Sequence, residues 1–245
     1  MAPALPIDSA RMAWWLSAWL RGNATPDDVR DAVLDGDAAH DLSGLPGADG
    51  TTSLLLSLGA IRRSGARSAG LALPAPGHPT GLGGPSDFNA AALESGEAVL
   101  LEGADLGLVP ARAGAGVVWQ VLPAGRRAID DLGEADRGLR ATVAATATAL
   151  VDLDVARWRP EVADELMNLR HVPTYDAPEG TPPRAVSLAG RALQALGIVE
   201  LAGEDHGGAM SAHEMARRSD ALLPLELAAR RAMVAACSPE VWPPA

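Results

Sequence analysis

AGLALPAPGHPTGLGGPSDFNAAALESGEAVLL, residues 69–101, contains four segments of different character. The short apolar runs Ala69–Leu73 and Glu97–Leu101 are typical of buried strands. Between them, Pro74–Gly84 is rich in Pro and Gly and predicts a loop, and Pro85–Ser95 predicts a helix that begins after Gly84. Strand, loop, helix and strand is the order of a βαβ unit, whose crossover we expect to be right-handed.

The segments on either side of this stretch extend the mixed pattern. Upstream, helices are predicted at 8–21, from Pro26 onward and at 54–63. Thr25 is a suitable cap for the second of them, because Pro26 and two acids follow it. Downstream, Leu106–Pro110 and Gly116–Leu122 predict two further strands.

The second half of the chain is predicted to be almost entirely helical. Its predicted helices are 133–155, 160–170, 184–196 and 211–237, the last one interrupted by Pro224. Ile198–Leu201 is predicted as a short strand. We therefore expect an α+β fold, with a mixed α/β domain at 1–125 and a mainly helical domain at 126–245 packed against it.

Composition excludes several chemistries. All 20 basic residues are Arg, and the absence of Lys excludes a Walker A loop, Schiff-base catalysis and pyridoxal phosphate attachment. A net charge of −11 disfavours binding to nucleic acid. Cys237 is the single cysteine, so an intramolecular disulfide is excluded. The longest apolar N-terminal run, Met12–Leu20, is too short to span a membrane, and we expect a cytoplasmic protein.

No catalytic set and no metal site is predicted. Ser68 is the nearest match to a nucleophile elbow, but Ala66 stands where the motif needs its first glycine, and Ser68 precedes a strand. Glu204, Asp205, His206, His213 and Glu214 offer metal-ligand chemistry. However, Ser211–Glu214 also fits a helix capping box, so we predict no metal and no cofactor.

The loop at 74–85 is the strongest candidate for a ligand site. A loop after a strand of an open α/β sheet is a common ligand position, and a helix start favours an anionic group. The candidate residues are His78, Gly81, Gly83, Gly84, Ser86 and Asn89. The alternative is a rigid connection whose Pro and Gly residues only set its path.

The first helix is the best candidate for a partner surface. Trp14, Trp15 and Trp19 provide large apolar side chains, and Trp is a frequent anchor at protein interfaces. The alternative is that they pack inside the protein, because the chain has only one Phe and one Tyr.

The sequence also resembles a known group of proteins. Residues 71–110, with GLGGPSDFNAAALESGEAVL and Gly107–Pro110, are similar to a family of uncharacterised proteins from high-GC bacteria. Gly133–Asp136 and the helical second half fit the same pattern. The resemblance implies a bacterial protein of unknown function and no catalytic residues.

These observations lead to two hypotheses for the function. The first is a non-catalytic binding or interaction protein that forms a homo-oligomer or binds a protein partner. The second is an enzyme or sensor that binds a small anionic ligand at the 74–85 loop. Neither hypothesis involves nucleic acid or a membrane, and the sequence leaves open whether the chain is an enzyme.

Overall fold

A computed structural model describes residues 2–48, 50–125, 127–152, 173–204 and 212–243. Its centre is a mixed sheet of six strands in the order β2-β1-β6-β5-β4-β3. The strands are β1 (His40–Ser43), β2 (Thr51–Ser53), β3 (Ser68–Ala72), β4 (Ala98–Glu102), β5 (Leu106–Ala113) and β6 (Gly116–Pro123). Only β1 and β6 run parallel; the other neighbours are antiparallel.

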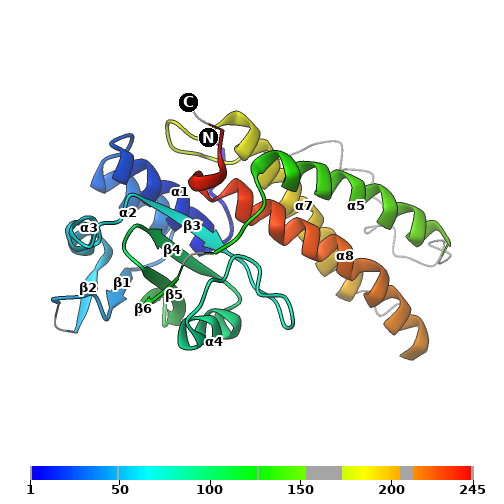
Figure 1. The fold of residues 1–245 in the computed structure, drawn as a ribbon, viewed down its shortest axis with the longest axis horizontal. Helices are drawn as coiled ribbons and strands as arrows, with labels where there is room; N and C mark the ends of the chain where they lie inside the picture. The colour runs from blue at the N-terminus through cyan, green and yellow to red at the C-terminus, as the bar shows by residue number, and fades with distance from the viewer. Residues whose placement is uncertain (1, 49, 126, 153–172, 205–211, 244–245) are drawn as a thin grey trace.

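Among the residues that the structure describes, four helices surround this sheet and three more form a separate layer beside it (Figure 1). The sheet helices are α1 (Asp8–Arg21), α2 (Pro26–Leu34), α3 (Leu54–Arg63) and α4 (Ser86–Ser95). The helical layer consists of α5 (Leu132–Asp152), α7 (Pro183–Glu204) and α8 (Ala212–Ala236), and a short 3-10 helix, Pro239–Val241, follows. The predicted α+β class, with a mixed sheet and a mainly helical second half, is confirmed.

The residues of β4 alternate between the two faces of the sheet. Val99 and Leu101 belong to the apolar cluster that α1, α2 and α3 build on one face. Ala98 and Leu100 belong to a smaller cluster on the other face, which α4 covers with Phe88. This alternation is the period of two that a strand imposes, and it explains why the run is continuously apolar.

The predicted parallel crossover at residues 69–101 is wrong. The strand–helix–strand order is present, but β3 and β4 are antiparallel neighbours, and Ala72 pairs with Ala98. The long connection therefore leaves β3 and enters β4 at the same end of these two strands, and does not cross the sheet. A connection of this length permits either direction, so the order of elements alone does not determine it.

The helical layer packs closely because its contact surfaces are rich in alanine. Ala189 and Ala192 of α7 are fully buried, as are Ala229 and Ala232 of α8. Small side chains let two helix backbones approach each other, which compensates for the scarcity of aromatic residues. The first 20 residues of α7 are also apolar and long enough to span a membrane, and 44% of their most apolar window is buried inside the protein.

The predicted strand at Ile198–Leu201 is also wrong, since these residues lie within α7. Ala195, Ile198 and Ala202 are buried at spacings of three and four residues, which is one face of a helix. Ile198 therefore lies on the buried face of α7, together with the alanines on either side of it.

The two halves of the chain share one apolar cluster. Leu71 of β3 and Leu73, which directly follows that strand, pack in the same cluster as Trp14 of α1 and Leu225 of α8. The backbone N–H of Leu71 also donates to the carbonyl of Cys237. The end of α8 thus lies against β3 and covers that edge of the sheet.

Candidate functional site

The loop at 74–85 satisfies its polar groups within the chain. The N–H of Gly84 donates to Asn89 Oδ1 at 3.0 Å, and the Gly84 carbonyl accepts from the Gly125 N–H at 2.7 Å. Ser86 Oγ donates to the Asp87 carboxylate at 3.2 Å. Three of the candidate ligand groups, on Gly84, Ser86 and Asn89, therefore have local partners already.

One of the candidate glycines in this loop has a close contact that requires glycine. Gly81 has a φ of +81°, and a Cβ there would lie 2.8 Å from Ala72 Cα. The contact of the Gly83 carbonyl constrains Gly125 instead, because a Cβ on Gly125 would lie 2.9 Å from that oxygen. His78 is half-buried, and its backbone forms a bridge with Ala75. Because β3 is antiparallel to β4, the loop also lacks the parallel-sheet position on which its prediction depended.

Two of the three tryptophans proposed as a partner surface lie inside the protein. Trp14 is 1% exposed, and its Nε1 donates to the Ala236 carbonyl at 3.1 Å. Trp19 is 7% exposed, and the Arg62 guanidinium lies 3.9 Å from its ring centroid. Trp15 is half-buried. The rings of Trp14 and Trp19 are therefore used for packing, as expected for a chain with so few other aromatic residues.

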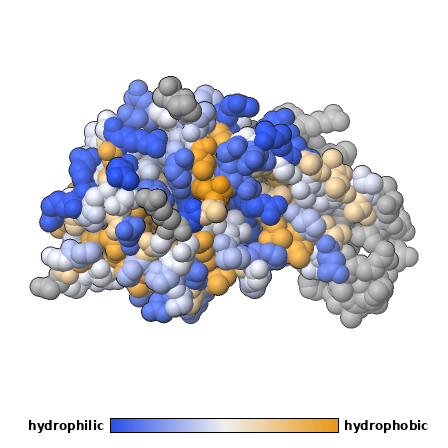
Figure 2. All heavy atoms as spheres, in the orientation of Figure 1, coloured by the Kyte–Doolittle hydropathy of each residue, from blue (hydrophilic) through white to orange (hydrophobic). Residues whose placement is uncertain are grey.

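The exposed large hydrophobic side chains are leucines. On the face shown in Figure 2, hydrophobic residues form separate patches among hydrophilic ones. Among the residues that the structure describes, those with the largest exposure are Leu55, Leu56, Leu93, Leu201 and Leu223. None of the three proposed tryptophans is among them.

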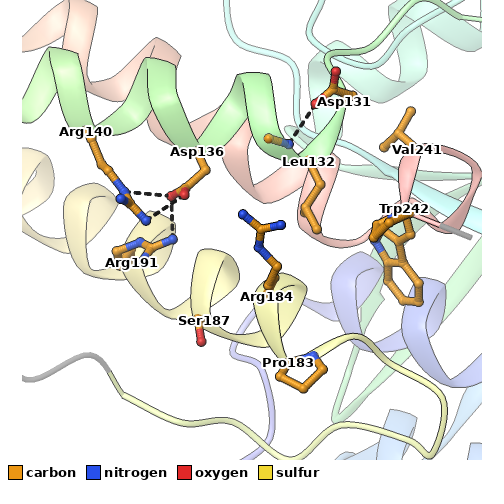
Figure 3. Close-up of a pocket in the computed structure, with 12 residues that line it drawn as sticks. Asp131, Leu132, Asp136, Arg140, Pro183, Arg184, Ser187, Arg191, Val241 and Trp242 are labelled. Atoms are coloured by element: carbon orange, nitrogen blue, oxygen red, sulfur yellow. Dashed lines mark hydrogen bonds and ion pairs between the residues drawn. The ribbon is translucent and has the colours of Figure 1, made fainter. Parts of the chain in front are cut away.

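The strongest candidate site is a cleft that the sequence analysis did not single out (Figure 3). It has a volume of about 650 Å³ and lies where α5 and α7 begin, beside the segment 237–243, which we call the C-terminal segment. This volume is within the usual range for small-molecule sites. Its lining residues are Asp131, Leu132, Gly133, Asp136, Arg140, Pro183, Arg184, Ser187, Arg191, Val241, Trp242 and Pro243.

One end of this cleft is strongly charged. Asp136 of α5 forms ion pairs with Arg140 on the same helix, at 2.7 Å, and with Arg191 of α7. Nε of Arg191 is buried and has no hydrogen-bond acceptor among the described residues. Three guanidinium groups and two carboxylates thus line the cleft.

Arg184 is the guanidinium that these carboxylates leave free. It is exposed at the centre of the cleft and has no ion pair with any described residue. Asp131 is occupied as the cap of α5, where Oδ1 accepts from the N–H groups of Gly133 and Glu134 at 2.7 and 2.8 Å. Arg184 can therefore pair with a bound anion without the loss of an ion pair to another described residue.

The other end of the cleft is apolar and has a fixed shape. Leu132, Pro183, Val241 and Trp242 form this end. The indole N–H of Trp242 lies 3.2 Å from each of the carbonyls of Ala235 and Ala236, which holds the ring in place.

A buried arginine fixes the C-terminal segment against the sheet. The Arg127 side chain is 1% exposed and donates to the Leu71 carbonyl. It also donates to Ser238 Oγ at 2.8 Å and pairs with Glu240 at 2.7 Å. The wall that contains Trp242 is therefore anchored two residues before that ring.

A second cavity, of about 440 Å³, lies between α4, the sheet and the start of α1. Asp8, Glu94, Glu97 and Arg112 line it. Burial raises the pKa of Glu97, opposed by the hydrogen bond that its carboxylate accepts from the Ser9 N–H at 2.7 Å. This bond satisfies the otherwise free start of α1, so the position of Glu97 has a structural explanation.

The charged residues of the larger cleft have a signal in the sequence that could have identified them. Arg184, Ser187 and Arg191 recur at three and four residues, which places them on one face of a helix. Trp242 has no comparable signal, because only the return of α8 brings it to the start of α7. The metal-ligand candidates Glu204–His206 and His213–Glu214 lie outside the residues whose side chains the structure describes.

Comparisons with known proteins identify relatives along nearly the whole chain. The model of the N-terminal domain of Rv1486c-like proteins matches residues 9–132, and the model of their C-terminal domain matches residues 133–234. The expected domain boundary near residue 125 stays a prediction. No solved structure matches this chain.

The relatives are uncharacterised proteins of mycobacteria. The uncharacterised protein Rv1486c of Mycobacterium tuberculosis is 31% identical, and the match covers 96% of this chain and 98% of the relative. The uncharacterised protein ML1804 of Mycobacterium leprae is 27% identical over the same shares. The predicted resemblance to an uncharacterised family of high-GC bacteria is confirmed, and this chain belongs to the family of Rv1486c-like proteins.

Proposed function

We propose that this protein binds a small anionic ligand in the cleft between α5, α7 and the C-terminal segment. The observation that carries the proposal is Arg184, an exposed cation at the centre of a cavity of about 650 Å³. A small anionic ligand belongs to the second of the two hypotheses from the sequence, which placed it at the 74–85 loop, whereas the proposal places it at a different position in the fold.

The electrostatics of the cleft favour an anion over a cation. Its three arginines outnumber its two aspartates, in a chain whose net charge is −11. Asp136 neutralises parts of Arg140 and Arg191, and Asp131 caps α5. Arg184 remains as an exposed donor, and charge-assisted hydrogen bonds from guanidinium to carboxylate or phosphate are among the stronger ones.

The positions of two helices support the same ligand. Both α5 and α7 begin at the cleft, so the positive ends of two helix dipoles point toward it (Figures 1 and 3). At the start of α5, the Asp131 carboxylate already accepts hydrogen bonds from the free N–H groups of the helix. The α7 end, with Arg184 as its second residue, adds to the attraction for an anion.

The loop at 74–85 is a weaker candidate than the cleft. Its Gly84, Ser86 and Asn89 groups already have partners, and Gly81 is explained by close packing against β3. An enzyme or sensor that uses this loop, a homo-oligomer and a cytoplasmic location all stay predictions.

Titration calorimetry with inorganic phosphate at low ionic strength tests the proposed anion site. We expect binding to the wild type and a loss of about tenfold or more in affinity for Arg184→Gln, since one charge-assisted contact is removed. Arg63→Gln is the matched control, because Arg63 is exposed at the end of α3 and does not line the cleft. Equal affinities of all three proteins, or no binding to the wild type, would contradict the proposal.

A further inference from the structure

The cleft is much larger than a phosphate or a single carboxylate requires. Its volume of about 650 Å³ is typical of a site for an organic molecule. Arg140, Asp136 and Arg191 lie at one end, Val241 and Trp242 at the other, and Arg184 lies between them (Figure 3). The site is therefore polarised along its length.

The apolar end offers no hydrogen bonds from its side chains. Pro183, Val241 and Leu132 have hydrocarbon side chains, and the single polar atom of the Trp242 side chain is committed to the Ala235 and Ala236 carbonyls. What Trp242 can present to a ligand is its ring carbon surface, which favours an aromatic partner. An inorganic anion would leave this surface unused.

The apolar end is also rigid, which favours a flat ligand over a flexible chain. Trp242 is held by its N–H contacts and by the Arg21 guanidinium, 5.8 Å from its ring centroid. Pro183 is a rigid ring at the first turn of α7. Fixed planar groups bind a planar ligand with little loss of side-chain entropy.

We infer that the ligand is an aromatic organic anion, with its phosphate or carboxylate group at Arg184 and its ring against Trp242. This inference rests on the anion site proposed above and adds the chemical class of the ligand. The anionic group lies at Arg184, in the middle of the cleft, while the ring occupies the end lined by hydrocarbon.

Three probes separate the two parts of this inference: inorganic phosphate, 2-naphthyl phosphate and 2-naphthoate. We expect wild-type protein to bind 2-naphthyl phosphate about tenfold or more tightly than inorganic phosphate, the gain expected when an aromatic ring stacks and leaves water. The comparison with 2-naphthoate distinguishes a phosphate head from a carboxylate head. Calorimetry measures all three affinities under the same conditions.

Two substitutions test which residues are responsible for the higher affinity for 2-naphthyl phosphate. Trp242→Leu should remove most of the difference between 2-naphthyl phosphate and inorganic phosphate, and leave binding of inorganic phosphate within about twofold. Arg184→Gln should weaken both phosphates by a similar factor. Trp242→Phe, which keeps a ring, should retain part of the gain and replaces the leucine variant if that variant does not fold.

The outcomes that overturn the inference differ from those that overturn the proposed function. If inorganic phosphate binds through Arg184 but the naphthyl group adds nothing, or its gain survives in Trp242→Leu, the aromatic class is wrong and the anion site stands. If neither phosphate nor 2-naphthoate binds, both are wrong.

Discussion

His40 shows at the scale of one residue how the sheet uses a buried polar group. Its side chain is fully buried, with Nε2 2.9 Å from the Asp37 carboxylate and Nδ1 3.1 Å from Trp119 Nε1. An indole nitrogen only donates, so Nδ1 accepts and Nε2 carries the hydrogen toward Asp37. The imidazole therefore links β1 to β6 through Trp119.

Replacing His40 by Phe leaves the Trp119 N–H without an acceptor in a buried place. We expect a loss of about 1–3 kcal/mol in the free energy of unfolding, measured by urea denaturation. His78→Phe is the control, since His78 is half-buried and its ring has no hydrogen bond to a described residue. Its effect should stay within about 0.5 kcal/mol. Similar losses in both variants would refute the role given to His40.

Glu97 makes stability depend on pH. Burial raises the pKa of its carboxyl above the ordinary 4.5. Its contribution to stability is therefore fully present below pH 4.5 and is lost as the pH rises through the higher folded pKa. Glu97→Gln retains an acceptor for the Ser9 N–H but cannot ionise. We expect it to be more stable than the wild type at pH 7, with the difference closing below pH 4.5.

Denaturation at a series of pH values measures this difference. Glu94→Gln is the control, because Glu94 is exposed in the same cavity and should show no such trend. A Glu97→Gln variant that is less stable than the wild type at pH 7 would contradict the expected direction.

At the scale of the element, the connection between β3 and α4 combines two kinds of glycine. Gly77 has a φ of +78° with nothing near its missing side chain, whereas Gly81 has the same type of backbone and backbone atoms of β3 against it. We expect Gly77→Ala to destabilise the protein by about 1 kcal/mol from backbone strain alone. We expect Gly81→Ala to lower the free energy of unfolding by about 2 kcal/mol or more, because the backbone strain and the steric clash with β3 add to each other.

Thermal unfolding of the two variants tests this packing role. If Gly81→Ala is as mild as Gly77→Ala, then the loop does not pack against β3 as the structure has it. If Gly81→Ala loses phosphate binding while its stability is unchanged, the result would instead support the 74–85 loop as a ligand site.

The sequence predicted the elements with local signals and missed those that depend on neighbours. The bounds of α1 and α3 were predicted to the residue, and the capping box of Thr25 and Asp28 is present at the start of α2. The strands β1 and β2 were not predicted, because His40–Ser43 has one apolar residue and Thr51–Ser53 has none. Pairing with β6 makes β1 a strand.

The candidate site was missed for a related reason. Arg184 and Arg191 share a helix face that the sequence shows, but their relation to Asp136 and Trp242 depends on how α5, α7 and the end of α8 pack together. No pattern within one segment contains that information. The 74–85 loop, by contrast, attracts notice for its composition. The structure explains Gly81 by close packing against β3, and Gly77 and Gly84 by a positive φ.

At the scale of the whole molecule, the shared apolar cluster predicts that the two halves unfold together. Leu71 and Trp14 pack with Leu225 of α8, and Arg127 joins the sheet to the C-terminal segment. We expect differential scanning calorimetry to show one transition, with equal calorimetric and van't Hoff enthalpies. Two resolved transitions would mean that the predicted domains at 1–125 and 126–245 are independent.

We propose the cleft at the start of α5 and α7 as the ligand site of this protein. A crystal structure of the complex with 2-naphthyl phosphate would place the ligand in or outside this cleft. We expect electron density for the phosphate within hydrogen-bond distance of Arg184 and for the ring against Trp242. Density for the ligand at the 74–85 loop or in the cavity beside Glu97, with the cleft empty, would contradict it.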